Sequence, residues 1–238
     1  MCTLFYNANL LMTDSSSEKC NAIKVENGVI TWIGSINPFQ NPDVQNPDID
    51  MKNIDLKGAY VLPGFLDSES HTCFSDFFTA VKNNELPPAE QEDWLDNAAE
   101  ILKDKGISSL MLTPDTFEAV HSRKNRFLIS IAEREELNFS ESDMSYGLEE
   151  PFSSFYDKFE SVPEALRSLT ADTSGACRKL TVGSFADFSI FEKNPLLSGM
   201  KFFANIHCIR IVKSGKTIYD MEEEAENEMF ALLMNQTF

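Results

Sequence analysis

The segments predicted to form strands lie at the two ends of the chain, and the predicted helices lie between them. Near the N-terminus, β-branched residues flank Asn27-Gly28, a pair that tolerates the positive φ angles of a type I′ hairpin turn. Apolar segments return after Gly183, and Ser214-Gly215 separates the last two of them as a second hairpin turn. This order predicts one β domain built from both ends of the chain, with the central segment inserted into it.

The central segment is predicted to alternate between helices and strands. From Pro88, apolar residues recur with the helical period as far as Gly106, which predicts a helix that ends there. The short apolar segment 107–113 predicts a strand, and apolar positions through Ala132 predict a second helix after it. Ser161-Val162-Pro163-Glu164 matches a capping box, which predicts the start of a further helix. The centre is therefore of the α/β type.

Composition excludes several classes of protein and partner. Of the 238 residues, 42% are hydrophobic and 24% are charged, as in a folded globular protein. The net charge of −18 repels phosphate backbones and anionic lipid headgroups, so neither nucleic acid nor a membrane surface is an expected partner. The chain has neither an apolar run long enough to span a bilayer nor the pattern of a signal peptide, which predicts a cytoplasmic protein.

The five cysteines are widely spaced and include no C-x-x-C pair. An odd number at such spacings indicates neither a disulfide framework nor a cysteine zinc site. We therefore expect reduced thiols, most of them buried as small apolar groups.

Two motifs at opposite ends of the central segment resemble those of one known family. The segment 58–71, GAYVLPGFLDSESH, resembles the entry to the barrel of the amidohydrolase superfamily, and 182–196, VGSFADFSIFEKNPL, resembles the exit from that barrel. The helix at 164–170 resembles the one before the exit, and the hairpin at Asn27-Gly28 resembles the N-terminal β domain of imidazolonepropionases and N-substituted formamide deformylases. The resemblance covers roughly residues 1–75 and 160–220.

The resemblance implies an α/β fold in which a composite β-sandwich domain holds an incomplete (β/α) barrel between its N- and C-terminal strands. Residues 1–62 and 181–220 would form the composite β domain and 63–180 the partial barrel. Independently of the resemblance, the acidic first turn and apolar second half of 221–238 predict an acidic C-terminal helix that docks on the body, with a frayed tail as the alternative. From residue 63 to residue 180 there are 118 residues. A βα unit needs about 30 residues, so only three or four of eight units fit.

The resemblance also implies a metal site at the first barrel strand. Members of the superfamily bind one or two divalent metals, which lower the pKa of bound water, and an aspartate of the last strand moves the proton. Carried over residue by residue, Glu69 and His71 would be metal ligands, and Asp143 would be the catalytic base. Glu69 stands where the family has the first histidine of an H-x-H pair. The implied cofactor is one divalent metal, with zinc preferred, or none.

The count of histidines opposes full activity. Besides His71 the chain has only His121, expected at a helix start, and His207, expected in the C-terminal β domain. One reading is a metal-dependent hydrolase of non-peptide C–N bonds in amides, formamides or cyclic amides, with reduced or lost activity and a small-molecule amide as its substrate. The alternatives are a non-catalytic binding or structural module, as a homo-oligomer that covers the open barrel edges, and a truncated product of a longer amidohydrolase.

Overall fold

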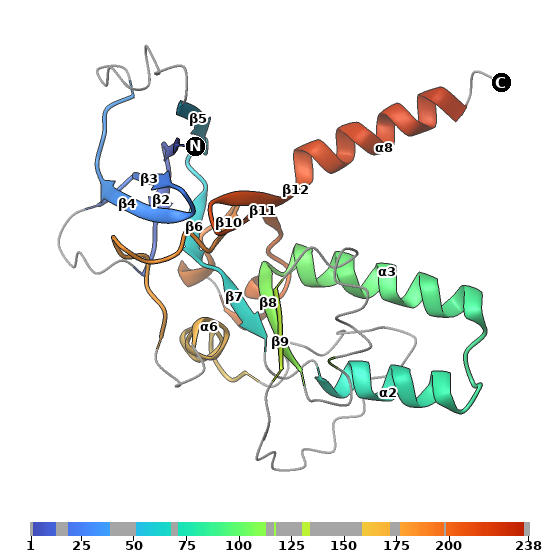
Figure 1. Cartoon of the computed structure of the whole chain (residues 1–238). Coiled ribbons are helices and arrows are strands. Elements are labelled where there is room, and N and C mark those ends of the chain that lie inside the picture. Colours follow the sequence, from blue (N-terminus) through green and yellow to red (C-terminus); the bar gives the residue numbers. More distant parts are fainter. Residues whose placement is uncertain are drawn as a thin grey trace.

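The computed structural model describes a mixed α/β chain whose strands form three sheets (Figure 1). The described residues are 2–12, 19–38, 51–67, 71–112, 117, 130–133, 159–171, 177–197 and 199–235. In these ranges no helix has the length and apolar character that a membrane crossing requires.

The elements follow one another with strands first, helices in the middle and strands again before a last helix. The N-terminal strands are β1 (Cys2–Tyr6), β2 (Asn9–Leu10), β3 (Ala22–Glu26), β4 (Val29–Gly34), β5 (Met51–Asp55), β6 (Tyr60–Pro63) and β7 (Phe65–Asp67). The central elements are α2 (His71–Lys82), α3 (Pro88–Asp104), β8 (Ile107–Leu112), β9 (Ser130–Glu133) and α6 (Val162–Thr170). The C-terminal elements are β10 (Phe188–Phe191), η1 (Pro195–Leu197), α7 (Met200–Phe203), β11 (Cys208–Lys213), β12 (Lys216–Asp220) and α8 (Met221–Asn235).

Strands from the two ends of the chain pair within one sheet. That sheet has the order β12-β11-β10-β6-β2, and β6 pairs antiparallel with β10, with Val61 opposite Ile190 and Leu62 opposite Ser189. A second sheet has the order β4-β3-β1-β5 and comes entirely from the N-terminal segment. The third is a parallel sheet of β7, β8 and β9, taken in chain order.

The four-stranded and five-stranded sheets share a hydrophobic core. At its centre the rings of Phe5 in β1 and Phe188 in β10 meet edge to face, with centroids 5.1 Å apart. The buried residues of this core are Phe5, Ala8, Ile23, Val25, Ile30, Leu56, Ala59, Val61, Leu180, Ala186, Phe188, Ile190 and Val212. Because they come from both ends of the chain, burying this core requires the two ends to fold together.

Two hairpin turns pack directly against each other at the end of this core. The β3–β4 turn has positive φ at both Asn27 and Gly28 (51° and 84°), which confirms the type I′ prediction. The β11–β12 turn has positive φ at Ser214 and Gly215 (46° and 74°). A Cβ atom on Gly28 would lie 2.8 Å from the carbonyl oxygen of Ser214, so only glycine permits this contact.

The parallel sheet and its helices form a second core. Figure 1 shows α2 and α3 lying side by side, and Phe77 of α2 stacks on Trp94 of α3 with ring centroids 4.2 Å apart. Ile107, Leu110 and Leu112 of β8 are fully buried in the same core. Leu62 and Phe191 of the five-stranded sheet also belong to it, so the two cores meet at β6 and β10.

Two local predictions are wrong. Ala132 was expected in a helix, but it lies in β9, where it pairs with Met111 of β8, because parallel pairing with a buried strand outweighs local helix propensity. The capping box also does not form as expected. Ser161 is the N-cap residue but makes no side-chain cap, and Glu164 accepts a hydrogen bond from the backbone N–H of Glu160 instead.

The C-terminal helix α8 contacts the body through its acidic first turns. Glu222 pairs with Lys57 at 3.2 Å and Glu224 pairs with Lys103 at 3.1 Å. Figure 1 shows that the helix then extends away from the rest of the molecule, and Met229 is 60% exposed. Among the described side chains, the ion pairs between this helix and the body therefore come from its first turns.

The described cysteines are all free thiols. Cys20 and Cys208 are buried, as expected, whereas Cys177 is exposed. Burial raises the pKa of the Cys208 thiol to about 12, so this group stays protonated and unreactive at neutral pH.

The packed turns give a stability prediction. In urea unfolding, Gly28→Ala should lower the free energy of unfolding by about 3 kcal/mol, because left-handed strain adds to a clash with backbone. Gly58→Ala is a matched control, since Gly58 has nearly the same φ (86°, against 84° at Gly28) but no atom within 4 Å of an added Cβ. It should cost only about 1 kcal/mol. Equal losses in the two variants would show that the turns do not touch.

Candidate functional site

A single residue, Gly64, separates two strands that belong to different sheets. β6 ends at Pro63 in the five-stranded sheet, and β7 begins at Phe65 in the parallel sheet. The chain therefore passes from the shared β core into the α/β part without a connecting loop. A Cβ on Gly64 would lie 2.4 Å from Oγ of Ser108, so the close approach of β8 requires glycine here.

Both backbone polar groups of Gly64 form hydrogen bonds with residues in the C-terminal half of the chain. Its N–H donates to the carbonyl oxygen of Asp187 at 3.0 Å. Its carbonyl accepts a hydrogen bond from Nη2 of Arg178, whose Nε also donates to the carbonyl of Thr170 at 3.4 Å. Arg178 thus joins the end of α6 to the junction of β6 and β7.

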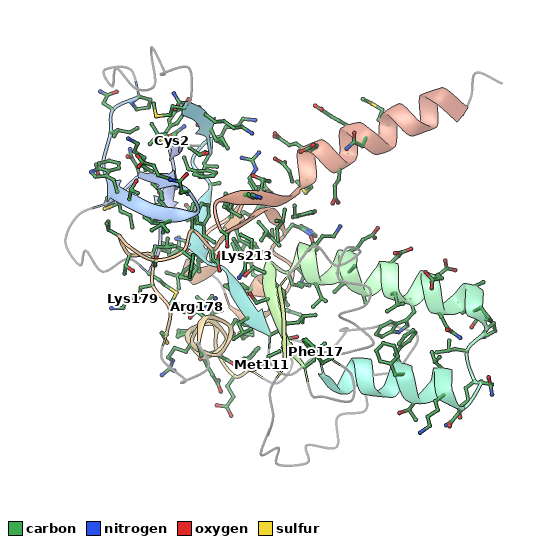
Figure 2. The ribbon with its side chains drawn as sticks, in the orientation of Figure 1. Cys2, Met111, Phe117, Arg178, Lys179 and Lys213 are labelled. Atoms are coloured by element: carbon green, nitrogen blue, oxygen red, sulfur yellow. The ribbon has the colours of Figure 1, made fainter. Side chains whose placement is uncertain are left out.

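The carboxylate of Asp187 is the centre of a polar cluster beside this junction. Its Oδ2 accepts a hydrogen bond from Nζ of Lys213 at 2.6 Å, and its Oδ1 accepts one from the backbone N–H of Ser214 at 2.7 Å. Lys213 also donates to Oγ of Ser109 at 2.9 Å. Figure 2 shows Lys213 where the five-stranded sheet meets the parallel sheet. This cluster connects β8, the start of β10 and the β11–β12 turn.

The carboxyl ends of the parallel strands form the edge where a functional site is expected in α/β proteins. β7 ends at Asp67, which is 2% exposed and lies opposite Leu110 of β8. β8 ends at Leu112, opposite Glu133 at the end of β9. A buried carboxylate at such an edge can bind a hard cation or accept a proton.

Of the sequence-predicted site residues, only His71 lies among the described residues. His71 is the first residue of α2, which begins four positions after the end of β7. Glu69 and Asp143 lie outside the described residues. Among the side chains that the structure describes, no group of three or more His, Cys, Asp or Glu residues is placed to hold a metal ion. Glu69 and His71 as ligands and Asp143 as base remain predictions.

His207 lies away from this edge, next to the C-terminal end of α3. Its Nδ1 lies 2.6 Å from Oδ1 of Asp104, and its side chain is 62% exposed. The residues on either side of Asp104 also join other elements: Lys103 pairs with Glu224 of α8, and Lys105 donates to the carbonyl of Ala204. His207 therefore belongs to a contact between α3 and the C-terminal segment.

Sequence reasoning did not single out Asp67, Asp187 or Lys213. Asp67 and Asp187 lie inside the entry and exit motifs, and each is an acidic residue placed directly beside a buried apolar run. That placement could have identified both residues from the sequence, because an acidic side chain next to a buried strand needs a hydrogen-bonding partner or has a function. Lys213 has no such signal, since its role depends on pairing across the chain.

No family model matches this chain, and no curated protein matches it. Several solved structures match part of this chain at low identity. A D-hydantoinase is 16% identical with a TM-score of 0.34, and the match covers 56% of this chain and 26% of that chain. A molinate hydrolase is 15% identical with a TM-score of 0.39, covering 57% and 30%. A protein described as an amidohydrolase is 16% identical with a TM-score of 0.34, covering 78% and 50%.

The chain thus spans 26% and 30% of the length of the first two structures. TM-scores this low do not establish a shared overall fold. Any family assignment therefore depends on the residues and contacts of this chain.

The Asp187 cluster predicts a measurable coupling. Lys213→Met should lower the free energy of unfolding by about 2 kcal/mol, because it leaves a largely buried carboxylate without its cation; both side chains are only 19% exposed. In a double-mutant cycle with Asp187→Asn, the coupling energy should be about 1 to 2 kcal/mol. Lys57→Met is the control, because the pair of Lys57 with Glu222 is 73% and 70% exposed, and it should cost no more than about 0.5 kcal/mol. Strict additivity of the Asp187 and Lys213 variants would contradict this assignment.

Proposed function

We propose that this chain is a divergent protein of the amidohydrolase superfamily whose activity toward non-peptide C–N bonds is reduced or lost. Residues 1–62 and 181–220 form its composite β-sandwich domain, residues 63–180 an incomplete (β/α) barrel inserted in that domain, and residues 221–238 an acidic helix. Within the superfamily we propose a relation to the imidazolonepropionases and N-substituted formamide deformylases, because the N-terminal hairpin resembles theirs.

The pairing of β6 with β10 carries this proposal. The entry motif supplies β6 and the exit motif supplies β10, and the two strands lie side by side with Pro63 opposite Phe188. This pairing is expected if a segment is inserted between two adjacent strands of a β domain. The inserted segment then begins at Gly64, directly after β6. The parallel order β7-β8-β9 supports a barrel-like insertion, because successive barrel strands are neighbours.

The proposed site is the carboxyl edge of β7. Glu69 and His71 follow Asp67 there and are the proposed metal ligands, with Asp143 as the proposed base. A divalent metal bound there would supply a Lewis acid and lower the pKa of a bound water. The described side chains contribute one buried carboxylate, Asp67, which is too few for a metal centre, so no catalytic step is assigned to them.

The histidines support reduced or lost activity. The superfamily pattern uses a histidine pair on the first strand and one histidine on each of two later strands, whereas this chain has three histidines in all. One of the three, His207, contacts Asp104 at 2.6 Å and is not near the edge of the parallel sheet. The two remaining histidines, His71 and His121, are too few to supply the four histidine ligands of the superfamily pattern.

Metal content and hydrolysis, measured on untagged protein purified without chelators, test the proposal. We expect bound zinc, manganese and iron well below one equivalent, as for a weak site, with a further fall in His71→Ala, and at most slow hydrolysis of amide, formamide and cyclic-imide substrates. His207→Ala is the matched control, because it removes a histidine away from the proposed site. A full equivalent of metal that is lost in His71→Ala and retained in His207→Ala, together with efficient metal-dependent hydrolysis, would contradict reduced or lost activity.

A further inference from the structure

A pocket of about 400 Å³ opens on the β domain, away from the parallel sheet. It lies between the β5–β6 turn, the β10 and β11 strands, and the point where β12 passes into α8. Its volume is within the range of pockets that bind small molecules. None of its lining residues belongs to β7, β8 or β9, so it is separate from the site proposed above.

The pocket lies beside an edge strand of the four-stranded sheet. β5 is the edge of the four-stranded sheet, whereas the five-stranded sheet continues past β10 to β11 and β12. Arg210 lies directly opposite Ile190 of β10 and Asp220 of β12. Arg210 lies two positions before Val212 in β11, so the two side chains share a face, and Val212 is buried in the shared core. Arg210 therefore extends the core-side face of β11 to the pocket.

The lining combines apolar surface with charge. Leu56, Ala59 and Ile190 are buried residues of the shared core that extend to the pocket wall. Such a wall favours a ligand with an apolar body, because removing the apolar surfaces of both the pocket and the ligand from water favours binding.

The two cations of the lining are already neutralised. Arg210 donates through Nε and Nη2 to Oδ2 of Asp220 at 2.7 and 2.6 Å, and these side chains are only 18% and 14% exposed. Lys57 pairs with Glu222 at the outer rim, 3.2 Å away. An anionic ligand would therefore have to compete with carboxylates that are already in place.

Two carboxylates of the lining have no cation among the residues that the structure describes. Asp55 accepts hydrogen bonds from the side-chain amide of Asn7 and the backbone N–H of Lys57, which are neutral groups. Glu192 makes no hydrogen bond or ion pair with any residue that the structure describes. The uncompensated charge of the pocket is therefore negative, as is that of the whole chain at −18.

We infer that this pocket binds a small organic cation, with its ammonium group beside Glu192 and its apolar body against Leu56, Ala59 and Ile190. An alkylammonium or arylalkylammonium ion meets both requirements. A neutral ligand of the same shape leaves the negative charge of Glu192 uncompensated, and an anion is repelled.

Titration of the full chain with benzylammonium, followed by amide chemical shifts in two-dimensional NMR, tests the inference. Benzyl alcohol and benzoate serve as the neutral and anionic probes of similar shape. Glu192→Gln removes the proposed counter-ion, and Glu223→Gln is the matched control, because Glu223 is an exposed residue of α8 that does not line the pocket.

We expect saturable shifts at Gly58, Glu192 and Arg210 with benzylammonium, and weaker or no shifts with the other two probes. Glu192→Gln should weaken binding by about fivefold, as for loss of an exposed ion pair, and Glu223→Gln should leave it within twofold, by the weak coupling of screened surface charges. Absence of saturable shifts, equal binding of benzyl alcohol, or equal losses in both variants would overturn the inference. Because no probe tests hydrolysis, a negative result leaves the proposed family unaffected.

Discussion

The transition at Gly64 is the constraint on which the rest of the structure depends. One residue separates β6 from β7, so the end of one sheet directly adjoins the start of the other. The position of this residue is fixed by the backbone of Asp187 on one side and by Arg178 on the other. Lys213 then neutralises the Asp187 carboxylate and reaches Ser109 of β8. Contacts from three distant parts of the chain therefore meet at one glycine.

Sequence patterns predict the elements of this structure better than their arrangement. Asn27-Gly28 predicts its hairpin because positive φ at both turn positions is a local property. The helix at Pro88–Asp104 follows from local periodicity in the same way. The pattern through Ala132 predicts a helix instead of the observed strand, because the strand conformation depends on pairing with β8, which no local pattern reveals. The partition of β5 and β6 between two sheets is likewise a result of tertiary packing.

The same distinction applies to the candidate sites. Sequence motifs indicate Glu69 and His71 through a family resemblance, and the structure adds the buried Asp67 immediately before them. The pairing of Asp187 with Lys213 and the pocket beside Glu192 could not be predicted, because each is assembled from residues that are close only after folding. The sequence indicates only that polar residues beside buried strands need hydrogen-bonding partners, and it does not identify those partners.

The central claim is that the two ends of the chain form one β domain through β6 and β10. Nuclear Overhauser effects between backbone protons of these strands test it most directly. The account predicts cross-strand effects between Val61 and Ile190 and between Leu62 and Ser189, which are direct partners in the antiparallel register. Their absence in a folded sample that shows the β3–β4 cross-strand effects would contradict the claim, since the N-terminal hairpin would then fold without the C-terminal strands.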